Sequence, residues 1–391
     1  MSLGDAGLAL VLDPGRLAEL VGREVRATYL RPKRGVSTTA ALTDPDGMPW
    51  GWVRTLTGDA VAKAAKARRA AEEAGLGGVV HEAVLPGRDT LVQWGPVVSD
   101  PRLVRVAAVL DPSPSDVLRH NPLRRLVVRD GERVVRVTAD HHRARLVQVT
   151  DDLAGAGVPV VTSTRAPEGR PGGRRVSWWP WVEGTDASAL AGPAADVLHE
   201  AGRVVGRLHS VDPALVRGLP VRGWTDLLAA ARSSVELLGE VAPGASGGAR
   251  RVLDELPAVV PAGPAVVCHG DLSPDQLLVV AGSGDVVLTD LDRAAVAPAE
   301  LDHASLVAVD LLDRAPGLTP LLEGYAATTG ARPRVPGPWV AAAVLARVAE
   351  PWRHQVAGWP GEVVRRALVA ARVLGVEDVW DERGQLLESV G

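Results

Sequence analysis

The chain has 391 residues, of which 46% are hydrophobic, so it can form two to three domains of roughly 150 residues each with a large core. Its net charge of −4 argues against a general nucleic-acid-binding surface, which needs a surplus of basic residues. No segment reaches the about 18 consecutive apolar residues of a membrane span, and the start of the chain lacks the pattern of an export signal. We therefore expect a cytoplasmic protein that binds neither nucleic acid nor membrane, and the composition leaves its oligomeric state open.

The amino-acid usage is strongly biased. The chain contains no Phe and no Ile but 11 Trp, and Lys occurs only at positions 33, 63 and 66, so nearly all of the 43 basic residues are Arg. Such a bias is typical of a GC-rich genome. The single cysteine, Cys268, excludes an intramolecular disulfide and a cysteine-based metal cluster.

The first part of the chain contains a weak internal repeat of strand, turn, strand and helix. The two units have their segments at residues 30–34, 44–47, 51–55 and 59–75, and at residues 118–122, 130–131, 134–138 and 141–155. Asp-Gly between alternating apolar residues is a strong hairpin signal. The alternative is that these are two unrelated hairpins in a protein rich in Val and Arg.

The second part of the chain is mainly helical. A Gly-, Pro- and Arg-rich loop over residues 165–175 leads into the apolar strand Ser177–Val182. Helical periodicity predicts helices at residues 196–210, 225–238, 299–313, 340–356 and 361–374, and three short strands at residues 265–268, 276–280 and 285–289. This order of elements predicts an α+β, two-lobed fold.

The densest group of reactive side chains lies around these three strands. The sequence HGDLSPDQ, residues 269–276, follows the first strand, and LTDLD, residues 288–292, closes the third. We expect Asp271, Gln276 and Asp290 to meet where the strands end, as rigid scaffolds often present reactive groups on loops. A carboxylate and an amide oxygen suit Mg²⁺, and a second carboxylate is left to accept a proton.

These motifs resemble the aminoglycoside phosphotransferase and choline-kinase branch of the kinase-like superfamily, over roughly residues 111–330. The resemblance implies a two-lobed protein-kinase-like fold with an additional N-terminal cap subdomain. It makes Asp271 the catalytic base, Gln276 a metal ligand in place of the usual Asn, and Asp290 the main metal ligand. Asp302 matches an aspartate that supports the catalytic loop in this family.

Three neighbouring residues have two interpretations each. His269 either anchors the catalytic loop through hydrogen bonds or transfers protons, and the first is favoured. Asp292 either belongs to the site or pairs with Arg293 on the surface. His209, in a Leu-His-Ser sequence that resembles the end of an early C-lobe helix of the family, is either packed at the helix end or catalytic, and packing is favoured.

The resemblance also implies a nucleotide site. The hairpin over residues 118–137 would cover ATP, and Trp179, Trp181, Val182 and Glu183 would form the hinge that meets the adenine. Arg136 stands where the family has Lys, and its fork of donors can hold phosphates. The helix that follows has no Glu to pair with Arg136 before Asp151, and no Gly-rich loop ending in Lys occurs in the chain.

The acceptor is less well defined. Residues 1–110 resemble the caps of maltokinase and glucosamine-kinase relatives, which also carry Gln where Asn is usual, and this favours a sugar or an amino sugar. Between Asp271 and Gly330 there are ten Asp or Glu but only two Arg, which favours cationic acceptors such as aminoglycosides. Alternatively, these carboxylates are committed to metal binding or helix capping.

Together these features predict a Mg²⁺-dependent kinase that moves the γ-phosphate of ATP or GTP to a hydroxyl of a small polar acceptor. We expect a cap-like subdomain over residues 1–110, an N-lobe and hinge over 111–183 and a helical C-lobe over 184–391. Two alternatives remain, because the usual Lys and Glu are missing and because the aspartates alone could bind a metal. The first is a catalytically weak nucleotide-binding module, and the second is a metal-dependent hydrolase.

Overall fold

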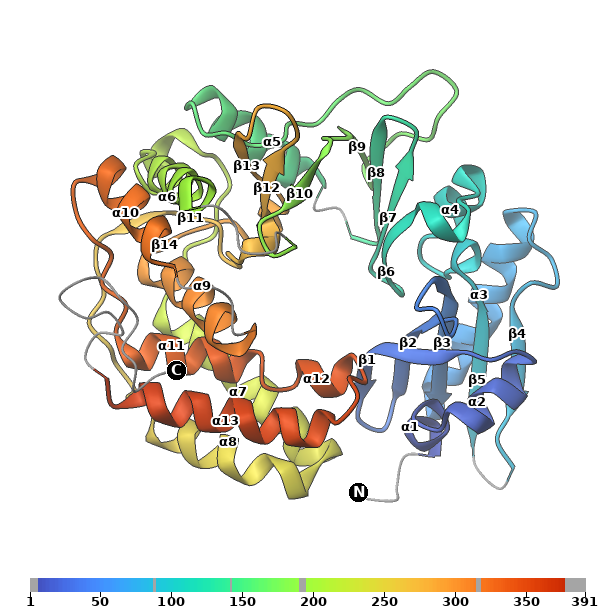
Figure 1. The fold of residues 1–391 in the computed structure, drawn as a ribbon. Coiled ribbons are helices and arrows are strands. Elements are labelled where there is room, and N and C mark those ends of the chain that lie inside the picture. Colours follow the sequence, from blue (N-terminus) through green and yellow to red (C-terminus); the bar gives the residue numbers. More distant parts are fainter. Residues whose placement is uncertain (1–5, 87–88, 141–142, 190–194, 314–317, 377–391) are drawn as a thin grey trace. The chain divides into compact units, whose positions relative to one another are not determined.

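The structure is a computed structural model that describes residues 6–86, 89–140, 143–189, 195–313 and 318–376 (Figure 1). Contacts divide the chain into two compact units. Unit 1 comprises Met1–Ala144, Ser163–Trp181 and Pro351–Ala357, and unit 2 comprises Arg145–Thr162, Val182–Glu350 and Gly358–Gly391. The predicted three-part division at residues 110 and 183 stays a prediction.

Unit 1 begins with two short helices and a five-stranded antiparallel sheet. These elements are α1 (Ala6–Val11), α2 (Pro14–Val21), β1 (Arg26–Lys33), β2 (Ser37–Thr43), β3 (Pro49–Thr57), α3 (Ala62–Glu73), β4 (His81–Val84) and β5 (Thr90–Pro96). The strand order is β1-β2-β3-β5-β4. The predicted turn between β2 and β3 forms because the Asp44 carboxylate accepts the N–H groups of Asp46 and Met48 at 3.0 and 2.8 Å.

The second sheet of unit 1 resembles the first in chain order, but it has four strands and not five. Helix α4 (Val104–Leu110) leads into β6 (Val117–Asn121), β7 (Arg125–Asp130), β8 (Arg133–Thr138), α5 (Arg143–Gly155) and β9 (Val176–Pro180), with the strand order β6-β7-β8-β9. In both sheets a three-stranded meander is followed by a helix, and a later strand then pairs antiparallel with the third strand. The two sheets thus share a meander followed by a helix, with three strands before the helix and not two, and the internal repeat itself stays a prediction.

A segment from late in the chain completes unit 1. Helix α12 (Glu350–Arg353) and the residues after it contact β1. The Thr28 hydroxyl donates to the carbonyl of His354 at 3.3 Å, and the rings of Tyr29 and His354 lie 4.4 Å apart. Arg353 donates to the carbonyl of Leu30 at 3.3 Å. The first strand of the protein thus packs against residues that follow it by more than 300 positions.

Unit 2 is mainly helical. Its helices are α6 (Ala195–His209), α7 (Trp224–Val241), α8 (Pro243–Glu255), α9 (Glu300–Asp313), α10 (Thr319–Thr329), α11 (Gly337–Ala346) and α13 (Trp359–Leu374). Helices α6, α7, α9 and α13 agree with the prediction, although α7 begins at Trp224 and the residue before it, Gly223, caps it by donating to Asp226 at 2.9 Å. The helix predicted over residues 340–356 is wrong in one respect, because it breaks after Ala346.

The predicted patch of three strands proves to be two separate small sheets. One pairs β11 (Ala265–Cys268) with β14 (Ala295–Pro298), and the other has the order β10-β12-β13, from β10 (Gly184–Asp186), β12 (Leu277–Val280) and β13 (Val286–Leu288). The expectation that three adjacent strand ends form the site is therefore wrong for β11, because its partner is a strand that lies beyond the Asp290 loop. No helix in the described ranges has both the length and the apolar character needed to cross a membrane.

Candidate active site

The candidate catalytic carboxylate lies on the loop that follows β11. The Oδ1 atom of Asp271 accepts from Arg347 at 3.0 Å, and its Oδ2 atom is 3.1 Å from the guanidinium of Arg293. The Asp271 side chain is 40% exposed, so a ligand can still reach it. Both carboxylate oxygens thus have a cationic partner in this structure.

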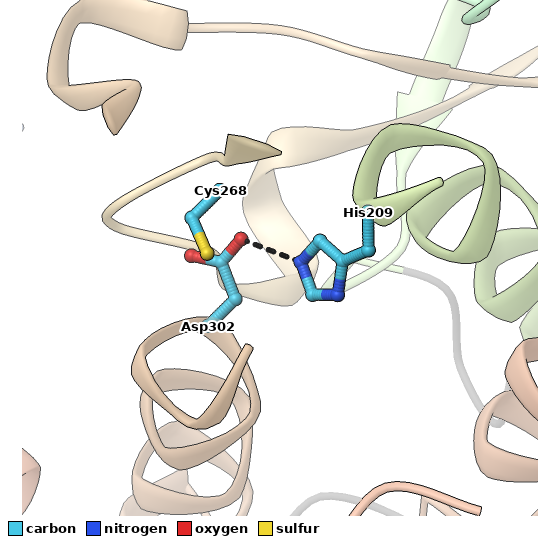
Figure 2. Close-up of side chains that lie close together, drawn as sticks. All are labelled: His209, Cys268 and Asp302. Carbon is cyan, nitrogen blue, oxygen red and sulfur yellow. Dashed lines mark hydrogen bonds and ion pairs between the residues drawn. The ribbon is translucent and has the colours of Figure 1, made fainter. Parts of the chain in front are cut away.

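A buried aspartate fixes the backbone of the same loop. Asp302, near the start of α9, is fully buried and accepts the backbone N–H groups of His269 at 2.6 Å and Gly270 at 2.8 Å. Its third donor is Nε2 of His209, at 3.1 Å (Figure 2). Burial alone would raise the pKa of Asp302, but the His209 hydrogen bond and the N–H groups outweigh it and hold the pKa below its ordinary value. An ionised Asp302 thus fixes the backbone of the Asp271 loop.

The donor atoms of His209, Cys268 and Asp302 lie within 4.8 Å of one another (Figure 2), which is close enough to share a metal ion. The chemistry of the three groups does not fit a metal site. Burial raises the pKa of the Cys268 thiol well above its ordinary value, and only the thiolate is a good ligand. Asp302 already accepts three hydrogen bonds, so this cluster is better explained as the support of the Asp271 loop.

Hydrogen bonds connect the Asp271 loop to the Asp290 segment. The ring Nε2 of His269 is 2.8 Å from the carbonyl of Thr289, which favours the anchoring interpretation of His269. Asp290 has φ 52°, in the left-handed region, and a short 3₁₀ turn, Leu291–Arg293, follows it. A non-glycine residue in this conformation is often found at functional sites, because the surroundings must stabilise it.

Gly270 allows these two segments to approach closely. It has φ +82°, and a Cβ atom at this position would lie 2.1 Å from the carbonyl oxygen of Arg293. Any side chain would therefore push the Asp271 loop away from the residues after Asp290. The glycine of the HGD motif is thus required for two reasons, its positive φ and its close approach to the Arg293 carbonyl.

Gln276 is connected to the same region. It ends the 3₁₀ turn Pro274–Gln276, and its backbone carbonyl accepts the N–H of Thr289 at 3.0 Å. Its Nε2 donates to Asp275 at 2.8 Å, which leaves the amide oxygen as the available ligand atom. This oxygen and the Asp290 carboxylate are hard donors of the kind that Mg²⁺ takes, so the residues present fit the predicted metal.

Two arginines donate to backbone carbonyls just after Asp290. The sequence analysis did not select them as site residues. Arg145, on α5, donates to the carbonyl of Asp292 at 2.6 Å, and Arg222 donates to the carbonyl of Arg293 at 3.3 Å. Burial, together with the charges of Arg293 and Arg145, lowers the pKa of Arg222. The role of the Asp292 side chain stays a prediction.

The predicted nucleotide contacts are divided between the two units. Arg136 lies in the middle of β8, and the Trp179 indole donates to the Ser177 hydroxyl at 3.0 Å. The Trp181 ring is 4.1 Å from the guanidinium carbon of Arg129. These three residues belong to unit 1, whereas Val182 and Glu183 belong to unit 2, with the Glu183 carbonyl accepting from Ala281 at 2.9 Å. Their joint role in binding a nucleotide stays a prediction.

Several of the ten carboxylates between Asp271 and Gly330 have structural partners. Asp302 holds the Asp271 loop, Asp275 accepts from Ser273 and Gln276, and Glu300 accepts the N–H of Gly263 at 2.8 Å. The charged groups that contact Asp271 directly are arginines. These contacts favour the alternative in which the acidic residues serve the fold, and they weaken the case for a cationic acceptor.

Comparison with solved structures found similar proteins of low sequence identity. A spectinomycin phosphotransferase, solved with ADP and spectinomycin, is 14% identical, with 65% of this chain and 91% of that chain covered and a TM-score of 0.46. A choline/ethanolamine kinase family protein from Mesorhizobium loti is 17% identical (66% and 88% covered, TM-score 0.46). A macrolide 2'-phosphotransferase from Brachybacterium faecium is 22% identical (69% and 97% covered, TM-score 0.41).

A comparison with curated proteins found no match. The family model described as "Phosphotransferase enzyme family" matches residues 113–339, which is more than half of the chain. The matched range contains the second sheet of unit 1, the Asp271 loop, Gln276, the Asp290 segment and Asp302. The predicted α+β fold is confirmed, with a further sheet ahead of the matched range, and the chain belongs to the phosphotransferase enzyme family.

Proposed function

We propose that this protein is a Mg²⁺-dependent kinase that transfers the γ-phosphate of ATP or GTP to a hydroxyl group of a small polar acceptor. An aminoglycoside, an amino sugar or a sugar would be suitable. The observation that supports this most is a pair of hydrogen bonds, between the His269 ring and the Thr289 carbonyl at 2.8 Å and from the Thr289 N–H to the Gln276 carbonyl at 3.0 Å. They connect the segments that carry Asp271, Gln276 and Asp290. We also propose that the protein acts in the cytoplasm.

In this proposal each side chain has one task. Asp271 accepts the proton of the acceptor hydroxyl, while the Gln276 amide oxygen and Asp290 hold Mg²⁺. The metal, when bound, supplies charge stabilisation for the transferred phosphoryl group. Arg136 steadies the phosphates, and residues 179–183 contact the adenine or guanine through their backbone.

The domain division belongs to the same proposal. Residues 111–183 would form the nucleotide-binding lobe and its hinge, and residues 184–391 would form the lobe that carries the catalytic loop. Residues 1–110 would form a cap. The repeated chain order of the two sheets in unit 1 supports a cap that is built like the nucleotide lobe.

The experiment is a transfer assay with Mg²⁺-ATP and Mg²⁺-GTP against a panel of aminoglycosides, amino sugars and neutral sugars. Asp271→Asn should lower turnover by about 10²- to 10⁴-fold, because that is the usual contribution of a general base. Asp285→Asn, at an exposed aspartate in the turn between β12 and β13, is the control and should leave turnover unchanged. Turnover that survives in Asp271→Asn would exclude the assigned base.

One observation favours the alternative of a weak nucleotide-binding module. Helix α5 directs Arg145 to the Asp290 segment, whereas the family resemblance places a Glu on this helix. Such a module would show a nucleotide-dependent rise in thermal stability without turnover on any acceptor. Ester cleavage that needs Mg²⁺ but no nucleotide would instead identify a hydrolase.

A further inference from the structure

The two arginines that contact Asp271 differ in how firmly they are held. Arg347 donates to Oδ1 and has a side chain that is only 14% exposed, whereas Arg293 contacts Oδ2 and is 62% exposed. An exposed ion pair exchanges its partner easily, because water and salt screen it. The two carboxylate oxygens are therefore not equivalent.

Arg347 is fixed by contacts on several sides. It lies directly after α11, and its Nη2 atom donates to the Ser305 hydroxyl at 2.8 Å as well as to Asp271. The Ser305 hydroxyl donates its proton to the carbonyl of Leu272 at 2.6 Å. Its oxygen is therefore the acceptor in the hydrogen bond with the guanidinium. The carbonyl of Arg347 accepts from Arg366 on α13 at 2.8 Å.

We propose that Arg347 is a positioning residue for the catalytic base, an inference that rests on the proposed function. It keeps Oδ1 of Asp271 during the reaction, while Arg293 leaves Oδ2 and the acceptor hydroxyl takes its place. The acceptor O–H bond breaks and its proton moves to Oδ2. The acceptor oxygen bonds to the γ-phosphorus, and the nucleoside diphosphate leaves with the electrons of the broken P–O bond.

The geometry explains why an arginine suits this task. Asp271 lies on a loop and is partly exposed, so without a fixed partner its carboxylate could rotate away from the hydroxyl. The planar guanidinium of Arg347 reaches Ser305 and Asp271 from the same nitrogen, and it thereby connects the catalytic loop to α9 and α11. A lysine ammonium is a point charge and can reproduce this geometry only in part.

The first test compares Arg347→Ala and Arg347→Lys with a matched control, Arg365→Ala. Arg365 is another partly buried arginine, 28% exposed, whose ion pair is with Glu362 on its own helix, α13. In the full chain, Arg347→Ala should lower kcat by about 10- to 100-fold with little change in the KM for nucleotide, as expected for a misplaced reacting group. Arg347→Lys should retain part of the activity.

Chemical rescue separates positioning from a general loss of structure. Millimolar guanidinium chloride should restore part of the kcat of Arg347→Ala, and it should not help Arg365→Ala or Asp271→Asn. Wild-type kcat in Arg347→Ala overturns the proposal. The proposal is also overturned if guanidinium does not restore the kcat of Arg347→Ala and if Arg347→Lys loses as much kcat as Arg347→Ala does.

A measurement without turnover distinguishes this inference from the proposed function. A double-mutant cycle of Asp271→Asn and Arg347→Lys, followed by denaturant unfolding of the full chain, should give a coupling that the cycle of Asp271→Asn and Arg365→Ala lacks. No coupling overturns the inference even if the wild type transfers phosphate. If the cycle shows coupling but the wild type transfers no phosphate, the contact is upheld and the proposed function is overturned.

Discussion

At the scale of single residues, the site depends on backbone positions that tolerate little change. Gly270 and Asp290 both lie in the left-handed region, one on each of the two segments that meet at the site. A Cβ at Gly270 would collide with the Arg293 carbonyl, so this position is restricted by its neighbour as well as by its own conformation. The two effects can be separated by experiment.

We predict that Gly270→Ala abolishes most of the transfer activity, by about 100-fold or more, because it displaces the loop that carries Asp271. Gly282→Ala is a matched control, since Gly282 has φ +84° but nothing within 4 Å of the added Cβ. Gly282→Ala should lower the free energy of unfolding by about 1–2 kcal/mol, which is the cost of an alanine in the left-handed region, and leave activity intact. Equal effects of the two substitutions on kcat would refute the contact argument.

A second residue predicts how stability depends on pH. Asp310, on α9, is buried, and its Oδ1 has no hydrogen-bond partner among the described residues. Burial, helped by the charge of Asp313, raises the pKa of Asp310 from 3.8 to about 7. The folded protein thus keeps a proton that the unfolded chain has lost, so this group lowers stability as pH rises through this window, and its full penalty remains above pH 7.

Asp310→Asn should therefore raise the free energy of unfolding, by little near pH 4 and by about 2–4 kcal/mol above pH 7. Denaturant unfolding at pH 4.5, 7 and 8.5 measures this difference. Asp254→Asn, at an exposed aspartate on α8, is the control. Its free energy of unfolding should depend on pH as that of the wild type does. A gain of the same size at all three pH values would contradict the assignment.

At the scale of elements, the support of the site depends on the packing of α6 against α10. His209 comes from α6, and its Nδ1 is 3.1 Å from the hydroxyl of Tyr325 on α10. The two helices cross at a pair of glycines. A Cβ at Gly202 would lie 1.8 Å from the carbonyl oxygen of Leu321, and a Cβ at Gly324 would lie 1.8 Å from that of His199.

Gly202→Ala should separate these helices and lower the free energy of unfolding by about 1–3 kcal/mol, as other overpacked cores do. Gly247→Ala on α8 is the control, because nothing lies within 4 Å of its added Cβ. It should stabilise the protein by about 0.5–1 kcal/mol, since alanine is the better helix former. Thermal or denaturant unfolding measures both, and a stabilising Gly202→Ala would contradict the close crossing.

The elements also show which information the sequence carries. The turns at Asp44–Gly47 and Asp130–Gly131 were predictable, because Asp and Gly act on neighbouring backbone atoms. The strands β10 and β14 were not predicted, because their three or four residues are ordinary and only distant partners make them strands. Helix α11 ends before Arg347 although apolar periodicity continues, because Pro351 has no N–H to donate to the Arg347 carbonyl, which accepts from Arg366 instead.

The candidate site follows the same rule. Asp271, Gln276 and Asp290 were selected because they stand in two short motifs close together in the sequence, and the hydrogen bonds between their loops agree with the expected grouping. Arg347 was not found, because it is 76 residues from Asp271 and no local pattern marks it. The roles of all these side chains in catalysis stay predictions.

At the scale of the whole molecule, unit 1 is assembled from three separate stretches of the chain. Its last stretch, Pro351–Ala357, contacts β1 through the hydrogen bonds and ring contact of Thr28, Tyr29 and His354. The N-terminal sheet is therefore a partner for a segment that the family match, which ends at residue 339, does not include.

We predict that a chain shortened to residues 111–391 leaves the segment after α12 exposed. Trypsin should then cut after Arg353 much faster than in the full chain, because the Leu30 carbonyl and the other β1 contacts are gone. Cleavage after Arg251, on the exposed side of α8 in unit 2, is the internal control and should keep its rate. Equal rates at Arg353 in the two chains would show that β1 does not protect this segment.

The contact between β1 and the end of α12 has a consequence for biosynthesis. Thr28 and the residue whose carbonyl it binds are 326 positions apart, so a ribosome that adds about 5–20 residues per second needs about 16–65 s to make the second after the first. During that time β1 emerges and can pair with β2, but its later partner does not exist. The edge of β1 therefore stays without this partner for most of the synthesis of the chain.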